Sequence, residues 1–192
     1  MEKIKLIHPF VHRCHNMDDL LKGCKKVSTF CTRLEKQSQL FPNRYDPNDY
    51  KGDGLEFLVE ALLKLNPTDN RIAIGSYEPV LSGDTGVDGL GKGIDGRPAA
   101  VQVKYRQSDW ILTANGDHLS NFPNAAYMKY GVPIDSKKHL LIITTGKELH
   151  HYTRDEMFQG KVRCIGYETL RDLLDNNILF WDALKDLAKN NK

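Results

Sequence analysis

The stretch AAVQVKYR, residues 99–106, decides which fold the sequence predicts. Side chains along a β-strand alternate between the two faces of a sheet. Val101 and Val103 therefore face one side, which suits a core. Gln102 and Lys104 face the other side, where burial is costly unless polar groups meet water or a ligand. The pattern predicts a central strand with a ligand site on one face.

A glycine-rich segment, GDTGVDG at 83–89, precedes this strand. The glycines around Asp88 leave room for a close approach by backbone or ligand. If the two segments pair as a hairpin, Asp88 comes near Gln102. A carboxylate, an amide oxygen, a main-chain carbonyl and waters suit Mg²⁺, a hard cation that takes oxygen ligands. A metal there would polarise a phosphoryl oxygen and activate water, and Lys104 would stabilise developing negative charge.

The rest of the chain predicts a mixed α/β architecture around this strand. Leucines line one side of a helix expected near 53–65. Further elements are a strand at 71–81, a helix at 117–130, strands at 139–146 and 161–167, and two closing helices. This order indicates a mixed central sheet flanked by helices.

Residues 1–50 are expected to form a helical N-terminal extension, and 51–192 the main domain. A helix over 17–39 begins after Asn16, a good capping residue, and turn formers at 41–52 indicate a linker. The extension also holds a loose cluster of potential zinc ligands: His8, His12, Cys14 and His15. Their spacing matches no common zinc pattern.

Composition places the chain among ordinary globular proteins. Its 192 residues are 40% hydrophobic and 27% charged. The formal net charge is only +2, so nucleic-acid binding would need a local basic patch. Residues 1–10 lack the apolar core of a signal peptide, and no apolar run reaches the ~20 residues that span a bilayer. We therefore expect a cytoplasmic protein with no membrane contact.

Four segments together resemble the PD-(D/E)XK nuclease superfamily. The resemblance is closer to its Mrr-like restriction endonuclease branch, where QxK often replaces the acidic form. The segments are GLEFLVEALL (54–63), GDTGVDG (83–89), VQVK (101–104) and LLIITTG (140–146). The resemblance covers about residues 52–181. It implies a restriction-endonuclease-like core.

The resemblance also implies a role for each matching residue. Asp88 matches the metal-ligating aspartate, and Gln102 matches a ligand that binds through its side-chain oxygen. Lys104 matches the catalytic lysine, and Glu56 the helical glutamate that often holds a metal-bound water or a second cation. Asp84 fits a supporting acidic position. Because Gln102 is neutral, the site carries one negative charge fewer than the acidic form, and one or two metals remain open.

Purely structural roles are open for the same residues. Glu56 follows Asp53 by three positions, which is the spacing of a capping box. Glu60 suits a solvated ion pair with the lysine four positions later. Asp88 could simply form a turn, and Lys104 could guard an edge strand against aggregation.

The resemblance implies a DNA endonuclease, dependent on Mg²⁺ or Mn²⁺, that hydrolyses phosphodiester bonds in restriction, defence or DNA processing. Nearby basic groups would hold the DNA backbone without reading bases. We assign Lys92, Arg106 and Lys147 to this DNA contact.

Two alternatives remain open. A non-catalytic DNA-binding or targeting module on the same fold agrees with the neutral Gln102. A structure-specific junction nuclease, acting as a homodimer, would use the same fold. Mrr-like domains are often fused to helicase or recognition domains, and the chain has no GxxxxGK[ST] motif. A helicase or recognition domain or subunit is therefore an expected partner, with this chain as the nuclease part of a larger protein.

Overall fold

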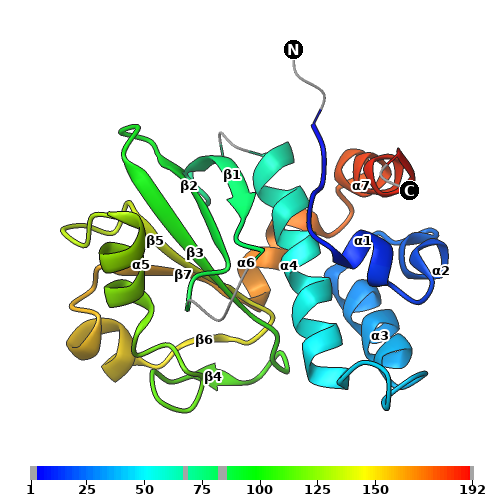
Figure 1. Ribbon diagram of the computed structural model, residues 1–192, viewed down its shortest axis with the longest axis horizontal. Coiled ribbons are helices and arrows are strands. Elements are labelled where there is room, and N and C mark those ends of the chain that lie inside the picture. The colour runs from blue at the N-terminus through cyan, green and yellow to red at the C-terminus, as the bar shows by residue number, and fades with distance from the viewer. Residues whose placement is uncertain (1–3, 67–68, 82–85, 191–192) are drawn as a thin grey trace.

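A five-stranded mixed sheet forms the centre of the computed structural model, which describes residues 4–66, 69–81 and 86–190. The strands lie in the order β1-β2-β3-β5-β7 (Figure 1). β2 runs antiparallel to β1 and β3, whereas β3, β5 and β7 are parallel. In that order the strands span Ile74–Pro79, Gly89–Gly93, Pro98–Lys104, Leu140–Thr144 and Val162–Ile165.

Helices cover both faces of this sheet (Figure 1). α4 (Pro47–Leu65) lies against β1 and β3 on one face. α5 (Phe122–Tyr130) contacts β3 from the other face. The predicted mixed α/β architecture, a central sheet flanked by helices, is therefore confirmed.

β3 occupies the middle of the sheet, as its alternating sequence predicts. Val101 and Val103 belong to the buried cluster that includes α4. Ala100 belongs to the cluster on the opposite face, and alternation places Gln102 on that face too. A central strand has no exposed edge to protect, so the edge-guarding role for Lys104 is wrong.

α4 begins at Pro47, earlier than its apolar pattern predicts. Asp46 caps it, because its side chain accepts hydrogen bonds from the amides of Asn48 and Asp49. Proline also suits the first helical position, where an amide hydrogen is not needed. The predicted linker therefore ends before Pro47, and the boundary predicted after residue 50 falls inside α4. Asp53 lies within the helix, so the proposed capping box is wrong.

Short helices precede α4, where the sequence predicts one long helix over 17–39. α1, α2 and α3 span Phe10–Arg13, Met17–Leu21 and Val27–Ser38. The Asn16 side chain caps α2 as predicted, accepting a hydrogen bond from the Asp19 amide at 3.0 Å. The long helix is interrupted after Leu21 because Gly23 adopts a left-handed conformation, with φ +60°. α1–α3 share one buried cluster with α4 and one face of the sheet.

Two helices close the chain as predicted: α6 (Tyr167–Leu174) and α7 (Ile178–Asn190). The sequence did not predict a parallel pair formed by β4 (Ile111–Leu112) and β6 (Glu148–Leu149), nor the π-helix η1 (Thr153–Met157). Among the described residues, no helix combines the length and the apolar character needed to cross a bilayer.

The helix predicted over 117–130 begins only at Phe122. The preceding residues form turns around the buried Asp117 carboxylate. That carboxylate accepts hydrogen bonds from Arg106, from the Trp110 indole and from the Thr113 amide. These contacts join residues that are separated along the chain, so helical periodicity did not reveal them.

Candidate active site

The hairpin of β2 and β3 brings Asp88 and Gln102 into direct contact. Asp88 directly precedes β2, and its backbone amide donates to the Val101 carbonyl at 2.9 Å. Its Oδ2 accepts hydrogen bonds from Gln102 Nε2 at 2.8 Å and from the Val103 amide at 2.6 Å. The predicted proximity of Asp88 and Gln102 is therefore present in the structure.

This pair offers oxygen atoms that suit a divalent cation. Gln102 is only 2% exposed, and its Oε1 has no hydrogen-bond partner among the described residues. Burial, together with the negative charge of Glu56, raises the pKa of Asp88 to about 7. An orphaned amide oxygen beside a destabilised carboxylate is the donor set that a hard divalent cation takes. The residues present therefore fit Mg²⁺ or Mn²⁺.

Lys104 stands at the end of β3, next to this pair. Its backbone carbonyl accepts hydrogen bonds from Thr144 Oγ1 at 2.7 Å and from the Thr145 amide at 3.3 Å. Its ammonium makes no hydrogen bond or ion pair with a described residue, and its charge acts to lower the pKa of Asp88. Because the Lys104 backbone is held in place and its ammonium has no ion-pair partner among the described residues, this side chain is suited to bind an anion.

Glu56 projects from α4 toward the same place and is held by His8. His8 Nε2 lies 3.0 Å from Glu56 Oε2. His8 Nδ1 accepts a hydrogen bond from the Phe10 amide at 3.3 Å, which assigns the ring proton to Nε2. His8 therefore donates to Glu56 through Nε2. Glu56 Oε1 makes no hydrogen bond to a described residue.

Glu60 fixes the N-terminal segment (residues 4–9) that carries His8. Its carboxylate is fully buried and accepts hydrogen bonds from the Ile7 amide at 2.7 Å and the His8 amide at 3.0 Å. Lys64 Nζ adds an ion pair at 2.9 Å. The predicted Glu60–Lys64 ion pair is therefore present, but it is buried under the N-terminal segment rather than solvated.

His8, Asp53 and Glu56 each offer a ligand atom within 4.8 Å of the others. Sequence reasoning missed this group. Asp53 and Glu56 are three apart on one helix and so share a face, which was a usable signal. His8 lies 48 residues from Glu56, and no spacing rule connects them. The Asp53 carboxylate also accepts a hydrogen bond from Tyr45 and lies 3.8 Å from Arg13.

These side chains surround one solvent-open cavity, the site cavity, of about 750 Å³. Glu56, Asp88 and Lys104 line it, while Gln102 lies behind Asp88. The Arg106 side chain reaches it as well, although its Nε pairs with Asp117 at 2.6 Å.

Other predicted residues lie elsewhere. Lys92 and Lys147 do not line the site cavity, because Lys92 occupies the far end of β2 and Lys147 precedes β6. Their predicted DNA contact at the site has no geometric support. Asp84 falls outside the described residues.

Comparisons with known proteins give one structural likeness. No protein-family model matches the sequence, and no curated protein matches it closely enough to count as a relative. Among solved structures, the chain is similar to the MspJI restriction endonuclease in complex with a 27-mer oligonucleotide, with 16% sequence identity and a TM-score of 0.42. The match covers 85% of this chain and 36% of that chain. The resemblance to the Mrr-like branch stays a prediction.

Proposed function

We propose that the protein is a metal-dependent endonuclease that hydrolyses phosphodiester bonds in DNA. The observation that carries the proposal is the convergence of Glu56, Asp88 and Lys104 on one open cavity, with Gln102 directly behind Asp88. Two carboxylates and an orphaned amide oxygen would hold a divalent cation, while the unpaired ammonium would face a phosphate. These groups suit metal-assisted hydrolysis of a phosphodiester.

Asp88 and Gln102, together with Glu56, would hold Mg²⁺ or Mn²⁺. When bound, the cation supplies positive charge that polarises a phosphoryl oxygen and activates a water molecule. Lys104 binds a phosphate oxygen and stabilises the negative charge that grows as water attacks in line. The P–O bond opposite the attacking water then breaks, giving one phosphomonoester and one hydroxyl end.

His8 and Glu56 act as a pair in this proposal. The imidazole holds one carboxylate oxygen, so the carboxylate keeps a single orientation. Glu56 Oε1 stays available to accept a hydrogen bond from the attacking water. A group held in place before substrate binds contributes more to the rate than a mobile one. His8 is therefore a positioning residue that acts through Glu56.

DNA as the substrate rests on the basic side chains among those that line the site cavity and on the PD-(D/E)XK resemblance. Arg13, Lys51 and Arg106 line the site cavity beside Lys104. Basic groups around a cleft hold the phosphate backbone without reading bases. Restriction or DNA processing, and a recognition or helicase partner, belong to the same proposal.

Incubation of the protein with supercoiled plasmid in Mg²⁺ or Mn²⁺ tests the proposal. We expect nicked and linear products that disappear with EDTA. Lys104→Ala should cut slower by a factor on the order of 10²–10³, because it loses a group that stabilises the transition state. Lys129→Ala, which removes an exposed charge outside the site cavity, should cut like the wild type.

The outcomes separate the alternatives. Equal cutting by wild type and Lys104→Ala would indicate a contaminating nuclease and overturn the proposal. Binding to DNA without cutting under any metal would favour the non-catalytic binding module. Cutting confined to branched DNA would favour the junction nuclease.

A further inference from the structure

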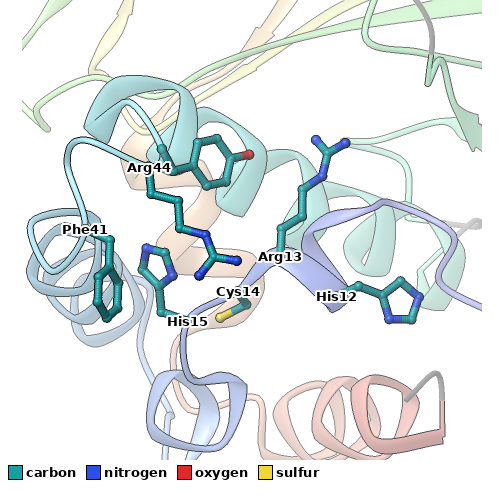
Figure 2. Close-up of a pocket in the computed structure, with 7 residues that line it drawn as sticks. His12, Arg13, Cys14, His15, Phe41 and Arg44 are labelled. Carbon is teal, nitrogen blue, oxygen red and sulfur yellow. The ribbon is translucent and has the colours of Figure 1, made fainter.

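A second cavity, the arginine cavity, lies between the α1–α2 connection and the turn before α4 (Figure 2). Its volume is about 560 Å³, within the range of ligand pockets. Arg13 and Tyr45 line both this cavity and the site cavity. The two cavities are therefore neighbours, and a single polymer strand could reach both.

The arginine cavity has an excess of positive charge. Arg13, Arg44 and His12 line it, and none of the acidic residues that the structure describes does. The Arg44 guanidinium makes no ion pair or side-chain hydrogen bond with any residue that the structure describes. The Arg13 side chain is 60% exposed, and its Nη1 lies 3.8 Å from the Asp53 carboxylate in a long ion pair. Exposed guanidinium groups suit phosphate oxygens.

Aromatic rings form the other wall of this cavity. His15 stacks on Tyr50, with ring centroids 4.5 Å apart at 16°. Phe41 meets the His15 ring edge-on at 4.9 Å and is itself 51% exposed. Figure 2 shows Arg44 reaching toward His15, with Phe41 beside that imidazole. An exposed ring next to a guanidinium offers a stacking surface for a flat ligand.

His15 carries a polar atom that the protein does not satisfy. Its Nε2 is buried and has no hydrogen-bond partner among the described residues. Burial and the charge of Arg44 lower the pKa of His15, which favours the neutral imidazole. A buried polar atom without a partner is costly, and a ligand with its own donor or acceptor would relieve that cost.

We propose that the arginine cavity binds one unpaired nucleotide of the DNA strand whose phosphodiester enters the site cavity. Arg44 and Arg13 hold its phosphate, while Phe41 and His15 contact its base. The nucleotide must be unpaired, because bases inside a duplex do not expose their faces to side-chain rings. The inference rests on the proposed function for the identity of the strand, but its test does not need cleavage.

The test measures DNA binding by fluorescence anisotropy with EDTA present and Lys104→Ala as the parent protein. Three labelled DNAs are compared: a blunt duplex, the same duplex with an unpaired extension, and that extension built from abasic sugars. We expect the parent to prefer the normal extension over the abasic one by roughly tenfold, the scale of one base stacked on an aromatic ring. Extensions at the 5′ and 3′ ends are both used.

Two variants assign the parts of the ligand. Phe41→Ala should remove the preference for bases and leave the affinity for the blunt duplex unchanged. Arg44→Ala should weaken the binding of both extended DNAs. It should also reduce the slope of log K against log salt by about 0.7, as expected for one lost phosphate contact on a single strand. Tyr127→Ala and Lys129→Ala are the matched controls, because both residues are exposed and line neither cavity.

Each outcome decides the inference separately from the endonuclease proposal. A parent protein without a base preference, or variants that bind all three DNAs like the parent, would overturn the nucleotide site even if the wild type cuts DNA. Loss of base preference in Phe41→Ala, with no cutting by the wild type, would support the nucleotide site and overturn the endonuclease proposal. Thermal melts measure the Tm of both variants. A Tm equal to that of the parent protein would show that the fold is intact.

Discussion

Asp88 is the residue on which the candidate site depends most. Its carboxylate joins the hairpin by accepting hydrogen bonds from Gln102 and Val103. Burial and the nearby Glu56 also make its charge unfavourable, raising its pKa to about 7. The same side chain therefore helps to build the hairpin and is poised to bind a cation.

Asp88→Asn tests both roles of this side chain, first through the pH dependence of protein stability with EDTA present. An acid whose folded pKa lies above its unfolded value of 3.8 keeps its proton longer when folded. The wild type should therefore lose stability as the pH rises from 3.8 through about 7, by a few kcal/mol at most, and then level off. Asp88→Asn should lack this loss. Thermal melts across that pH range measure it.

Cation binding gives the second half of the Asp88 test. At pH 8, Mg²⁺ or Mn²⁺ at a hundredfold excess over Kd should raise the wild-type Tm by roughly 5–10 °C. Asp88→Asn should gain little, because it lacks the charged ligand. Equal pH profiles and equal cation responses in both proteins would contradict the assigned role of Asp88.

The residue scale also shows where sequence reasoning reached its limit. Asp88 and Gln102 could be paired from sequence because a short hairpin brings them together with a simple register. His8 could not be linked to Glu56, since their contact depends on how the N-terminal segment packs on α4. The arginine cavity escaped prediction for the same reason.

At the scale of elements, the junction between β7 and α6 has no space for a side chain. A Cβ on Gly166 would lie 1.9 Å from the carbonyl oxygen of Lys147, a backbone atom that cannot move aside easily. Gly166→Ala should therefore destabilise the protein by about 1–3 kcal/mol and lower its Tm by roughly 2–10 °C. Differential scanning calorimetry measures the change.

Gly52→Ala is the control for that prediction. Gly52 lies in α4, and a Cβ there would meet no atom of the described part of the chain within 4 Å. The exchange should stabilise the helix by about 0.5–1 kcal/mol, because alanine has the higher helix propensity. Similar Tm changes in the two alanine variants would show that the close contact at Gly166 does not destabilise the alanine variant.

Elements were predictable where periodicity was strong, and their ends where a cap was recognised. Each of the five sheet strands lies within or overlaps a predicted segment. The break at Gly23 and the start of α4 at Pro47 were missed, because apolar periodicity alone outweighed glycine and capping signals. The β4–β6 pair was missed because two-residue strands carry no periodicity.

At the scale of the whole molecule, the N-terminal helices and one face of the sheet share a single buried cluster. Phe30 of α3 packs near Trp181 of α7, with ring centroids 6.1 Å apart. We therefore expect one cooperative unfolding transition rather than separate melting of residues 1–50.

Phe30→Ala tests that expectation. It should lower the free energy of unfolding by about 3–5 kcal/mol through the cavity it creates. The urea transitions followed by circular dichroism and by tryptophan fluorescence should both shift and should still coincide. Two separated transitions, with only one shifted, would show that the first fifty residues unfold on their own.

The N-terminal segment has a consequence for how the protein can be handled or controlled. Glu56 owes its orientation to a short stretch that is attached to the body through the Ile7 and His8 amides, the His8 imidazole, the Lys5 carbonyl and the buried Leu6 side chain. A protease cut between His8 and Phe10 would disconnect the His8 imidazole from the body of the protein while leaving every strand of the sheet in one piece. Removal of these few N-terminal residues would then inactivate the candidate active site without unfolding the protein.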